Sequence, residues 1–210
     1  MDTAVAAIIH DAKNSLAALD TWLAEAERSA PSEALLHARL SAQRVSAQLV
    51  ELLVLYRAGE GSLRLAIDDR DIGDMVRELL SEVVPLPGQP AIDVDLDAID
   101  AIGFWAYDVY QVKLVVADAL RNALRFGKTR VGLRVTPVPG DGLCFEIRDD
   151  SDGYPADILA GEDAPAVAGG TRLGLRFARM IAEHHATPAG RHGRIELSND
   201  GGAVFRLYLP

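Results

Sequence analysis

Two stretches with the spacing of amphipathic helices occupy the first 60 residues. In each stretch, apolar residues recur at alternating spacings of three and four, which predicts a helix with one buried stripe. The first stripe comprises Val5, Ile9, Ala12, Leu16, Leu19, Leu23 and Ala26, and the second comprises Leu35, Ala38, Ala42, Val45, Leu49, Leu52 and Tyr56. The first helix is expected to end near Arg28, and Ser29 or Ser32 is expected to cap the second. Gly59 and Gly61 are expected to end the second helix.

Two such helices joined by a short turn predict an antiparallel hairpin over residues 1–60. A hairpin of two helices cannot bury both apolar stripes by itself. Two copies form a four-helix bundle, so the pattern predicts a homodimer. The alternative is that the stripes pack on the chain's own second domain.

The pattern changes after residue 60 to short alternating runs separated by helical periods. The helical periods cover residues 71–84, 108–126 and 173–185. The alternating runs that indicate strands cover residues 63–67, 92–96, 129–135, 143–148, 194–198 and 203–209. Strands that pair in antiparallel runs, with the helices on one face, predict a two-layer α/β sandwich over residues 61–210. The predicted fold class is therefore α+β, a helical hairpin followed by a sandwich domain.

Composition argues against some classes of binding partner and favours one kind of cellular compartment. The formal net charge is −10 and the isoelectric point is about 4.9, which argues against a nucleic-acid or acidic-membrane partner. The single cysteine, Cys144, excludes a disulfide framework and favours a reducing compartment. No apolar stretch approaches the roughly 20 residues that a membrane span needs, and no signal-peptide pattern opens the sequence. We expect a soluble cytoplasmic protein without a membrane span.

The first helix carries a possible phosphoryl acceptor. His10 and Asn14 are four residues apart and share a helix face, with Asp11 about a quarter-turn away. A neutral imidazole nitrogen can attack phosphorus while a neighbouring carboxylate holds or takes the other ring proton. The alternative is an ordinary solvated histidine on a helix surface.

Three segments of the sandwich domain are candidates for ligand binding. Asp118 and Asn122 share a helix face, and their oxygens suit Mg²⁺ and, through it, phosphate. Asp149 follows a strand and can accept a hydrogen bond from an exocyclic amine such as that of adenine, and Gly153 lets backbone approach a ligand. The segment 169–175 opens a helix with glycines, as anion sites do. Each segment also has a structural reading, as a solvated helix face, an acidic turn or an ordinary glycine turn, and the hairpin around 199–202 is expected to carry no chemistry.

Taken together and in this order, the segments resemble the transmitter core of two-component sensor histidine kinases over residues 5–210. His10, Asp11 and Asn14 resemble the phosphoacceptor box, and 118–126 resembles the N box of the family. Residues 149–155 resemble the first glycine box, Asp-x-Gly-x-Gly, and 170–175 resemble the second, Gly-Thr-Gly-Leu-Gly-Leu.

The resemblance implies a Bergerat or GHKL-like ATPase domain that uses ATP and Mg²⁺, with the metal near Asn122. It implies that His10 attacks the γ-phosphate, that Asp11 is the general base, and that the phosphoryl group then passes to the receiver domain of a response regulator. In the family, the residue at the position of Asn14 also orients water for dephosphorylation of that partner. The implied nucleotide-binding residues are Asp118, Asn122, Arg125, Asp149, Gly153, Gly170, Thr171, Arg172, Leu173, Gly174 and Leu175.

The sequence departs from the family pattern in the nucleotide site. Ser151 and Arg172 replace glycines of the two boxes, and Asp118 replaces the Asn or Glu common one turn before the metal-binding Asn. The segment between the boxes is short and lacks the phenylalanine that is usual there. These departures leave two alternatives to an active kinase. One is a histidine phosphotransferase that relays phosphate with a degenerate nucleotide site, and the other is a non-catalytic signalling adaptor.

Overall fold

The computed structural model describes residues 3–30, 32–140, 142–161 and 173–210, with side chains described for all of these except 3–11, 13, 27 and 33. The chain divides into two compact units, Met1–Leu63 and Arg64–Pro210. Each unit has its own architecture.

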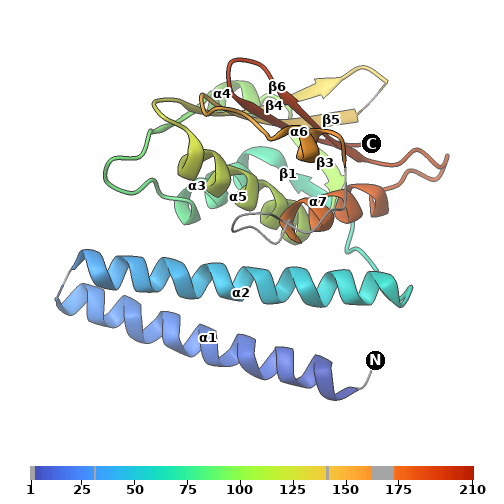
Figure 1. The fold of residues 1–210 in the computed structure, drawn as a ribbon. Helices are drawn as coiled ribbons and strands as arrows, with labels where there is room; N and C mark the ends of the chain where they lie inside the picture. Colours follow the sequence, from blue (N-terminus) through green and yellow to red (C-terminus); the bar gives the residue numbers. More distant parts are fainter. Residues whose placement is uncertain (1–2, 31, 141, 162–172) are drawn as a thin grey trace. The chain divides into compact units, whose positions relative to one another are not determined.

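The first unit is a helical hairpin of α1 (Thr3–Ser29) and α2 (Glu33–Gly59), which run antiparallel (Figure 1). Of the two serines considered as caps, Ser32 begins α2, because its hydroxyl accepts a hydrogen bond from the Leu35 N–H at 3.2 Å. The Asp20 carboxylate on α1 accepts hydrogen bonds from Arg39 Nε at 3.2 Å and from Gln43 Nε2 at 2.9 Å, both on α2. These bonds hold the two helices in one register.

The second unit is built on a five-stranded sheet in the order β2-β4-β5-β7-β6. The strands are β2 (Ile92–Val94), β4 (Val131–Val138), β5 (Gly142–Asp149), β6 (Arg194–Asn199) and β7 (Ala203–Leu209). A separate two-stranded sheet pairs β1 (Asp68–Asp71) with β3 (Phe104–Tyr107).

Three helices lie on one face of the larger sheet: α3 (Ile72–Glu82), α5 (Val109–Phe126) and α7 (Leu173–His184) (Figure 1). Their apolar stripes and the inward residues of β5 and β7, such as Leu120, Phe145, Phe177 and Leu207, are fully buried in the core. Two short helices, α4 (Leu96–Asp100) and α6 (Ala156–Leu159), complete the unit. The predicted two-layer α+β architecture is confirmed.

The opposite face of the sheet is polar. Glu146 on β5 pairs with Arg206 on β7 at 2.7 Å and with Arg148 at 2.9 Å. On β6 and β7, the Arg194 guanidinium lies 3.9 Å from the centre of the Tyr208 ring. A face of charged cross-strand neighbours is compatible with water, which explains why the sandwich has only two layers.

Two local predictions are wrong. Residues 62–67 form no helix or strand, although Leu63 and Leu65 are partly buried and Arg64 and Ala66 exposed. The Ala66 N–H donates a hydrogen bond to the Asp108 carboxylate at 2.8 Å. A side-chain oxygen therefore accepts the hydrogen bond that the backbone of a neighbouring strand would otherwise accept. The strands are also not all antiparallel, because β2 pairs in parallel with β4. The intervening α4, β3 and α5 form the long crossover that parallel pairing requires.

Candidate functional site

Helix α5 presents Asp118 and Asn122 together. Its other side is apolar and buried through Val112, Val116 and Leu120, which turns these two polar residues away from the core. The Asn122 Nδ2 donates a hydrogen bond to Asp118 Oδ2 at 3.2 Å. The structure therefore places them on one face, with the Asn122 amide oriented by Asp118.

The first turn of α7 packs against the same carboxylate. A Cβ atom added to Gly174 would lie 2.3 Å from Asp118 Oδ2, so a larger residue here would displace the Asp118 side chain. Leu173 and Leu175 on either side are partly buried. The structure thus brings part of the second glycine segment to Asp118, while Gly170, Thr171 and Arg172 lie outside the described residues.

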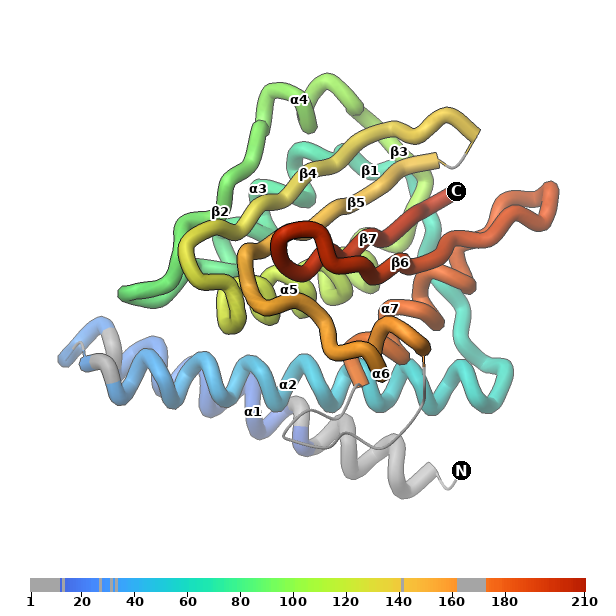
Figure 2. The backbone as a smooth tube through the Cα atoms, turned by 45° about the horizontal axis from the view of Figure 1, so that its top comes forward, coloured from blue at the N-terminus to red at the C-terminus, as the bar shows by residue number. Residues whose placement is uncertain are grey.

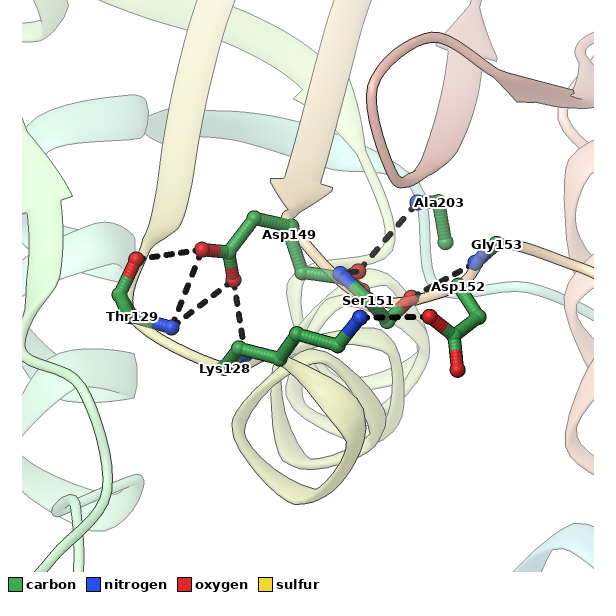
Figure 3. A network of polar contacts seen from close by, with 8 residues as sticks. Lys128, Thr129, Asp149, Ser151, Asp152, Gly153 and Ala203 are labelled. Atoms are coloured by element: carbon green, nitrogen blue, oxygen red, sulfur yellow. Dashed lines mark hydrogen bonds and ion pairs between the residues drawn. The ribbon is translucent and has the colours of Figure 1, made fainter.

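Asp149 stands at the end of β5 and uses one of its two carboxylate oxygens within the protein. Its Oδ1 accepts hydrogen bonds from the Ser151 N–H at 2.8 Å and the Ala203 N–H at 3.3 Å (Figure 3). Among the described residues, none forms a hydrogen bond with Oδ2. One oxygen thus fixes the side chain and the other is available to a ligand.

The neighbouring Asp150 is instead a structural anchor. Its carboxylate accepts hydrogen bonds from the Thr129 hydroxyl and from the backbone N–H groups of Lys128, Thr129 and Arg130. The Thr129 hydroxyl and then the backbone donors hold the pKa of Asp150 well below its usual range. Asp150 therefore ties the α5–β4 connection to the end of β5.

A surface ion pair covers this connection. Lys128 Nζ lies 2.5 Å from Asp152 Oδ1 (Figure 3). Their hydrogen bond and mutual charge raise the pKa of Lys128 and lower that of Asp152. Both side chains are exposed, so the pair contributes little to stability.

Tyr154 lies in the loop that follows β5. Burial raises the pKa of its hydroxyl, and the charges of Asp149 and Asp118 raise it further. Carboxylates from β5 and from α5 therefore both act on the electrostatics of this hydroxyl. The sequence analysis did not single out Tyr154, because a tyrosine in an acidic turn has no distinctive pattern.

Arg125 lies on the last turn of α5. Its guanidinium is 5.1 Å from the centre of the exposed Phe126 ring, and Arg125 is itself exposed. The described contacts of Arg125 therefore include an aromatic neighbour but not Asp118 or Asp149.

The residues of the phosphoacceptor box lie on α1. His10 and Asp11 fall within the helix, but their side chains lie outside the described ones. Asn14 is exposed on the same helix, one turn after His10.

The sequence analysis also missed the contribution of the β6–β7 connection. A Cβ at Gly202 would lie 1.9 Å from the Asp149 carbonyl oxygen, and Asn199 forms two hydrogen bonds with the Tyr154 backbone. Antiparallel pairing of β7 with β5 puts this hairpin, which was expected to carry no chemistry, beside the end of β5.

Residues 107–210 match the sequence profile of the family described as histidine kinase-, DNA gyrase B- and HSP90-like ATPases. No curated protein matches the sequence. The match covers every described site residue of the second unit, from Asp118 to Asn199.

Solved structures of histidine kinases share the fold. The Acinetobacter baumannii histidine kinase AdeS is 18% identical, with a TM-score of 0.59 over 93% of this chain and 95% of AdeS. Full-length ShkA in complex with AMPPNP is 16% identical, with a TM-score of 0.62 over 97% of this chain and 44% of ShkA. The cytoplasmic segment of the histidine kinase QseC is 15% identical, with a TM-score of 0.55 over 78% of this chain and 94% of that segment.

These matches confirm the fold of the histidine kinase-like ATPase domain and support the resemblance to the transmitter core of sensor histidine kinases. In the described ranges, no helix combines the length and the apolar composition that a membrane crossing requires.

Proposed function

We propose that the protein is a histidine kinase that phosphorylates His10 from ATP and passes the phosphoryl group to an aspartate of a response regulator. The observation that carries the proposal is the placement of Asp118 and Asn122 on one face of α5, with the first turn of α7 packed against Asp118, in a histidine kinase-like ATPase domain. The complex of the related ShkA with AMPPNP supports an adenine nucleotide as the ligand.

Each residue has a role in this proposal. Asp149 Oδ2 accepts a hydrogen bond from the exocyclic amine of adenine. The N-terminal turn of α7, with Gly170–Leu175, approaches the phosphates, and Arg125 adds positive charge at the end of α5.

The residues near Asn122 suit Mg²⁺, because an amide oxygen and a neighbouring carboxylate are hard oxygen ligands, and Mg²⁺ usually shares such ligands with phosphate oxygens. Asn122 and Asp118 would hold the ion, which supplies charge neutralisation of the phosphates. Among the described residues, no group of three or more His, Cys, Asp or Glu side chains could hold a metal ion.

Phosphoryl transfer from ATP to His10 forms one bond to phosphorus and breaks another. One nitrogen of neutral His10 forms a bond to the γ-phosphorus, the bond from phosphorus to the bridging oxygen breaks, and ADP leaves with the electron pair. Asp11 accepts or holds the proton of the other ring nitrogen. In the second step, the N–P bond breaks as a receiver aspartate forms an acyl phosphate. Asn14 orients water for hydrolysis of that acyl phosphate.

The hairpin supplies the dimer in this proposal. Large apolar side chains are exposed on both helices of the protomer, with exposed fractions of 38% for Leu19, 70% for Trp22, 45% for Val45 and 45% for Leu52. Burial of these side chains against a second copy would complete a four-helix bundle.

Incubation of the purified protein with γ-labelled ATP and Mg²⁺ tests the proposal. The expected label is acid-labile and alkali-stable, as on a phosphohistidine, and disappears in His10→Ala. Asn14→Ala should retain the label and lose phosphatase activity toward the partner. A label that persists in His10→Ala would contradict the assignment of the acceptor.

The second candidate is a histidine phosphotransferase with a degenerate nucleotide site. The departures from the family's glycine boxes favour it, because Ser151 and Arg172 replace glycines there. In that case the protein would remain unlabelled by ATP and accept phosphate on His10 from a phosphorylated response regulator.

A further inference from the structure

One amide side chain links the β6–β7 hairpin to the loop that follows β5, and Figure 2 shows these two segments side by side. Asn199, the last residue of β6, accepts a hydrogen bond on Oδ1 from the Tyr154 N–H at 2.8 Å. Its Nδ2 donates to the Tyr154 carbonyl oxygen at 3.0 Å. The oxygen and the nitrogen of the Asn199 amide both form hydrogen bonds with the same residue. Asn199 therefore replaces the pair of backbone hydrogen bonds that a neighbouring strand would supply.

The loop can approach Asn199 because the preceding residue is glycine. Gly153 has φ of +85°, a conformation that side chains other than glycine rarely adopt. A Cβ atom at Gly153 would also lie 2.6 Å from Asn199 Cγ. Glycine at this position therefore serves the contact with Asn199 as well as the turn.

A continuous series of hydrogen bonds runs from this contact to Asp149. The Gly153 N–H donates to Ser151 Oγ at 3.1 Å, and the Ser151 N–H donates to Asp149 Oδ1 at 2.8 Å. The other side of the hairpin contacts the same atom, because the Ala203 N–H donates to Asp149 Oδ1 at 3.3 Å. Both ends of the β6–β7 turn thus restrain the loop that carries Asp149.

We propose that Asn199 is a positioning residue of the nucleotide site. It holds the 149–154 loop so that Asp149 keeps Oδ1 bonded to the protein and Oδ2 directed to the base. Asn199 itself contacts the loop and not the nucleotide. This role rests on the proposed function, in which Asp149 receives adenine.

The test uses the full chain and two measurements. Hydrogen exchange at the Tyr154 amide, followed by NMR without nucleotide, reports the loop, and calorimetric titration with ADP reports the site. Asn199→Ala removes both bonds, so Tyr154 exchange is expected to be about tenfold faster and the ADP dissociation constant about tenfold higher. Asn199→Asp keeps an acceptor for the Tyr154 N–H and loses the donor, so its ADP affinity should be intermediate.

Asp200→Ala is the matched control. Asp200 is the next residue in the hairpin, and its carboxylate pairs at 2.7 Å with Arg148 of β5 rather than with a residue of the 149–154 loop. This variant should change Tyr154 exchange and ADP affinity by less than about twofold.

Unchanged Tyr154 exchange in Asn199→Ala would overturn the proposal, and so would faster exchange with unchanged ADP affinity, which would leave Asn199 a purely structural role. Equal losses of affinity in Asp200→Ala and Asn199→Ala would overturn it as well. A failure of the proposed function is recognised separately, because the wild-type protein would then bind no ADP. That result would remove the assigned role too.

Discussion

The adjacent residues Asp149 and Asp150 have different roles, although both carry a carboxylate. Asp149 keeps one oxygen without a hydrogen bond to the described residues, whereas Asp150 is bonded to the α5–β4 connection through both oxygens. Two adjacent carboxylates in a turn are equivalent in the sequence. Their difference arises from the strand pairing, which points one toward Ala203 and the other toward Thr129.

Asn122→Ala is expected to raise the dissociation constant for Mg²⁺-ATP by about tenfold or more, because it removes the oxygen proposed to bind the metal. Calorimetric titrations with and without EDTA measure how much of the ATP affinity depends on Mg²⁺. This Mg²⁺-dependent gain in affinity should be smaller in the variant, while the oligomeric state should stay unchanged. Equal Mg²⁺-ATP affinity in wild type and variant would show that α5 does not carry the metal site.

His185 is a buried histidine whose neutral form the fold requires. Its Nε2 accepts a hydrogen bond from the Asp108 N–H at 3.0 Å, and its Nδ1 faces the Ile181 carbonyl oxygen at 2.8 Å. The carbonyl can only accept, so Nδ1 carries the proton and Nε2 does not. Burial lowers the pKa of His185, with the Ile181 carbonyl and Asp108 opposing that shift and the charge of His184 adding to it.

The free energy of unfolding should therefore fall as the pH drops below about 6.5, the ordinary histidine value. Above that value the ring is neutral in both states, whereas below it the unfolded chain binds a proton more readily. Protonation in the folded state would leave the buried Asp108 N–H without its acceptor, at a cost of about 1–3 kcal/mol.

Urea unfolding of wild type and His185→Gln between pH 8 and pH 5 measures this loss. The variant should show a flatter dependence on pH in the upper part of this range. His192→Gln, at an exposed histidine, is the control and should follow the wild type. A wild-type curve that coincides with that of His185→Gln would contradict the role of His185.

At the scale of elements, the β6–β7 connection approaches β5 more closely than any side chain allows. Gly202 has φ of +152°, and a Cβ there would lie 1.9 Å from the Asp149 carbonyl oxygen. Gly201 next to it has φ of +67° but faces open space. Both glycines have positive φ, but only Gly202 is crowded. A comparison of alanine variants at the two positions therefore measures the added effect of crowding.

Gly202→Ala is expected to lower the free energy of unfolding by about 2–4 kcal/mol, because the added methyl group displaces the backbone of β5. Gly201→Ala should cost about 1 kcal/mol, from its backbone conformation alone. Chemical denaturation of both variants gives the comparison. Equal losses would mean that the close approach to Asp149 has no energetic weight.

The long elements could be predicted from the sequence, whereas most of the short ones other than β2 could not. The helices at 109–126 and 173–184 bury one regular apolar stripe each, and that stripe is visible as periodicity. The strand of four residues at 104–107 and the helix of five at 96–100 are too short to show a period. The proposed nucleotide-site residues on helices were singled out by spacing. Tyr154 and Asn199 meet through the pairing of distant segments, which spacing does not encode.

At the scale of the whole molecule, the exposed apolar side chains of the hairpin predict a dimer. Leu52→Glu places a charge on α2 where 45% of the leucine is exposed in the protomer. Light scattering after size-exclusion chromatography should show a dimer for wild type and a monomer for the variant, because burial of an unpaired carboxylate opposes association. Ser41→Glu, at an exposed polar position of the same helix, should remain dimeric. A monomeric wild type would contradict the four-helix bundle.

Every later step of the proposed reaction requires nucleotide binding, and calorimetric titration of the wild-type protein with Mg²⁺-ATP tests that binding most directly. We expect one nucleotide bound per chain, with affinity at least about tenfold weaker in Asp149→Asn, because an amide in place of the carboxylate loses a charge-assisted acceptor. No detectable binding at millimolar nucleotide, or equal affinity in wild type and Asp149→Asn, would contradict it.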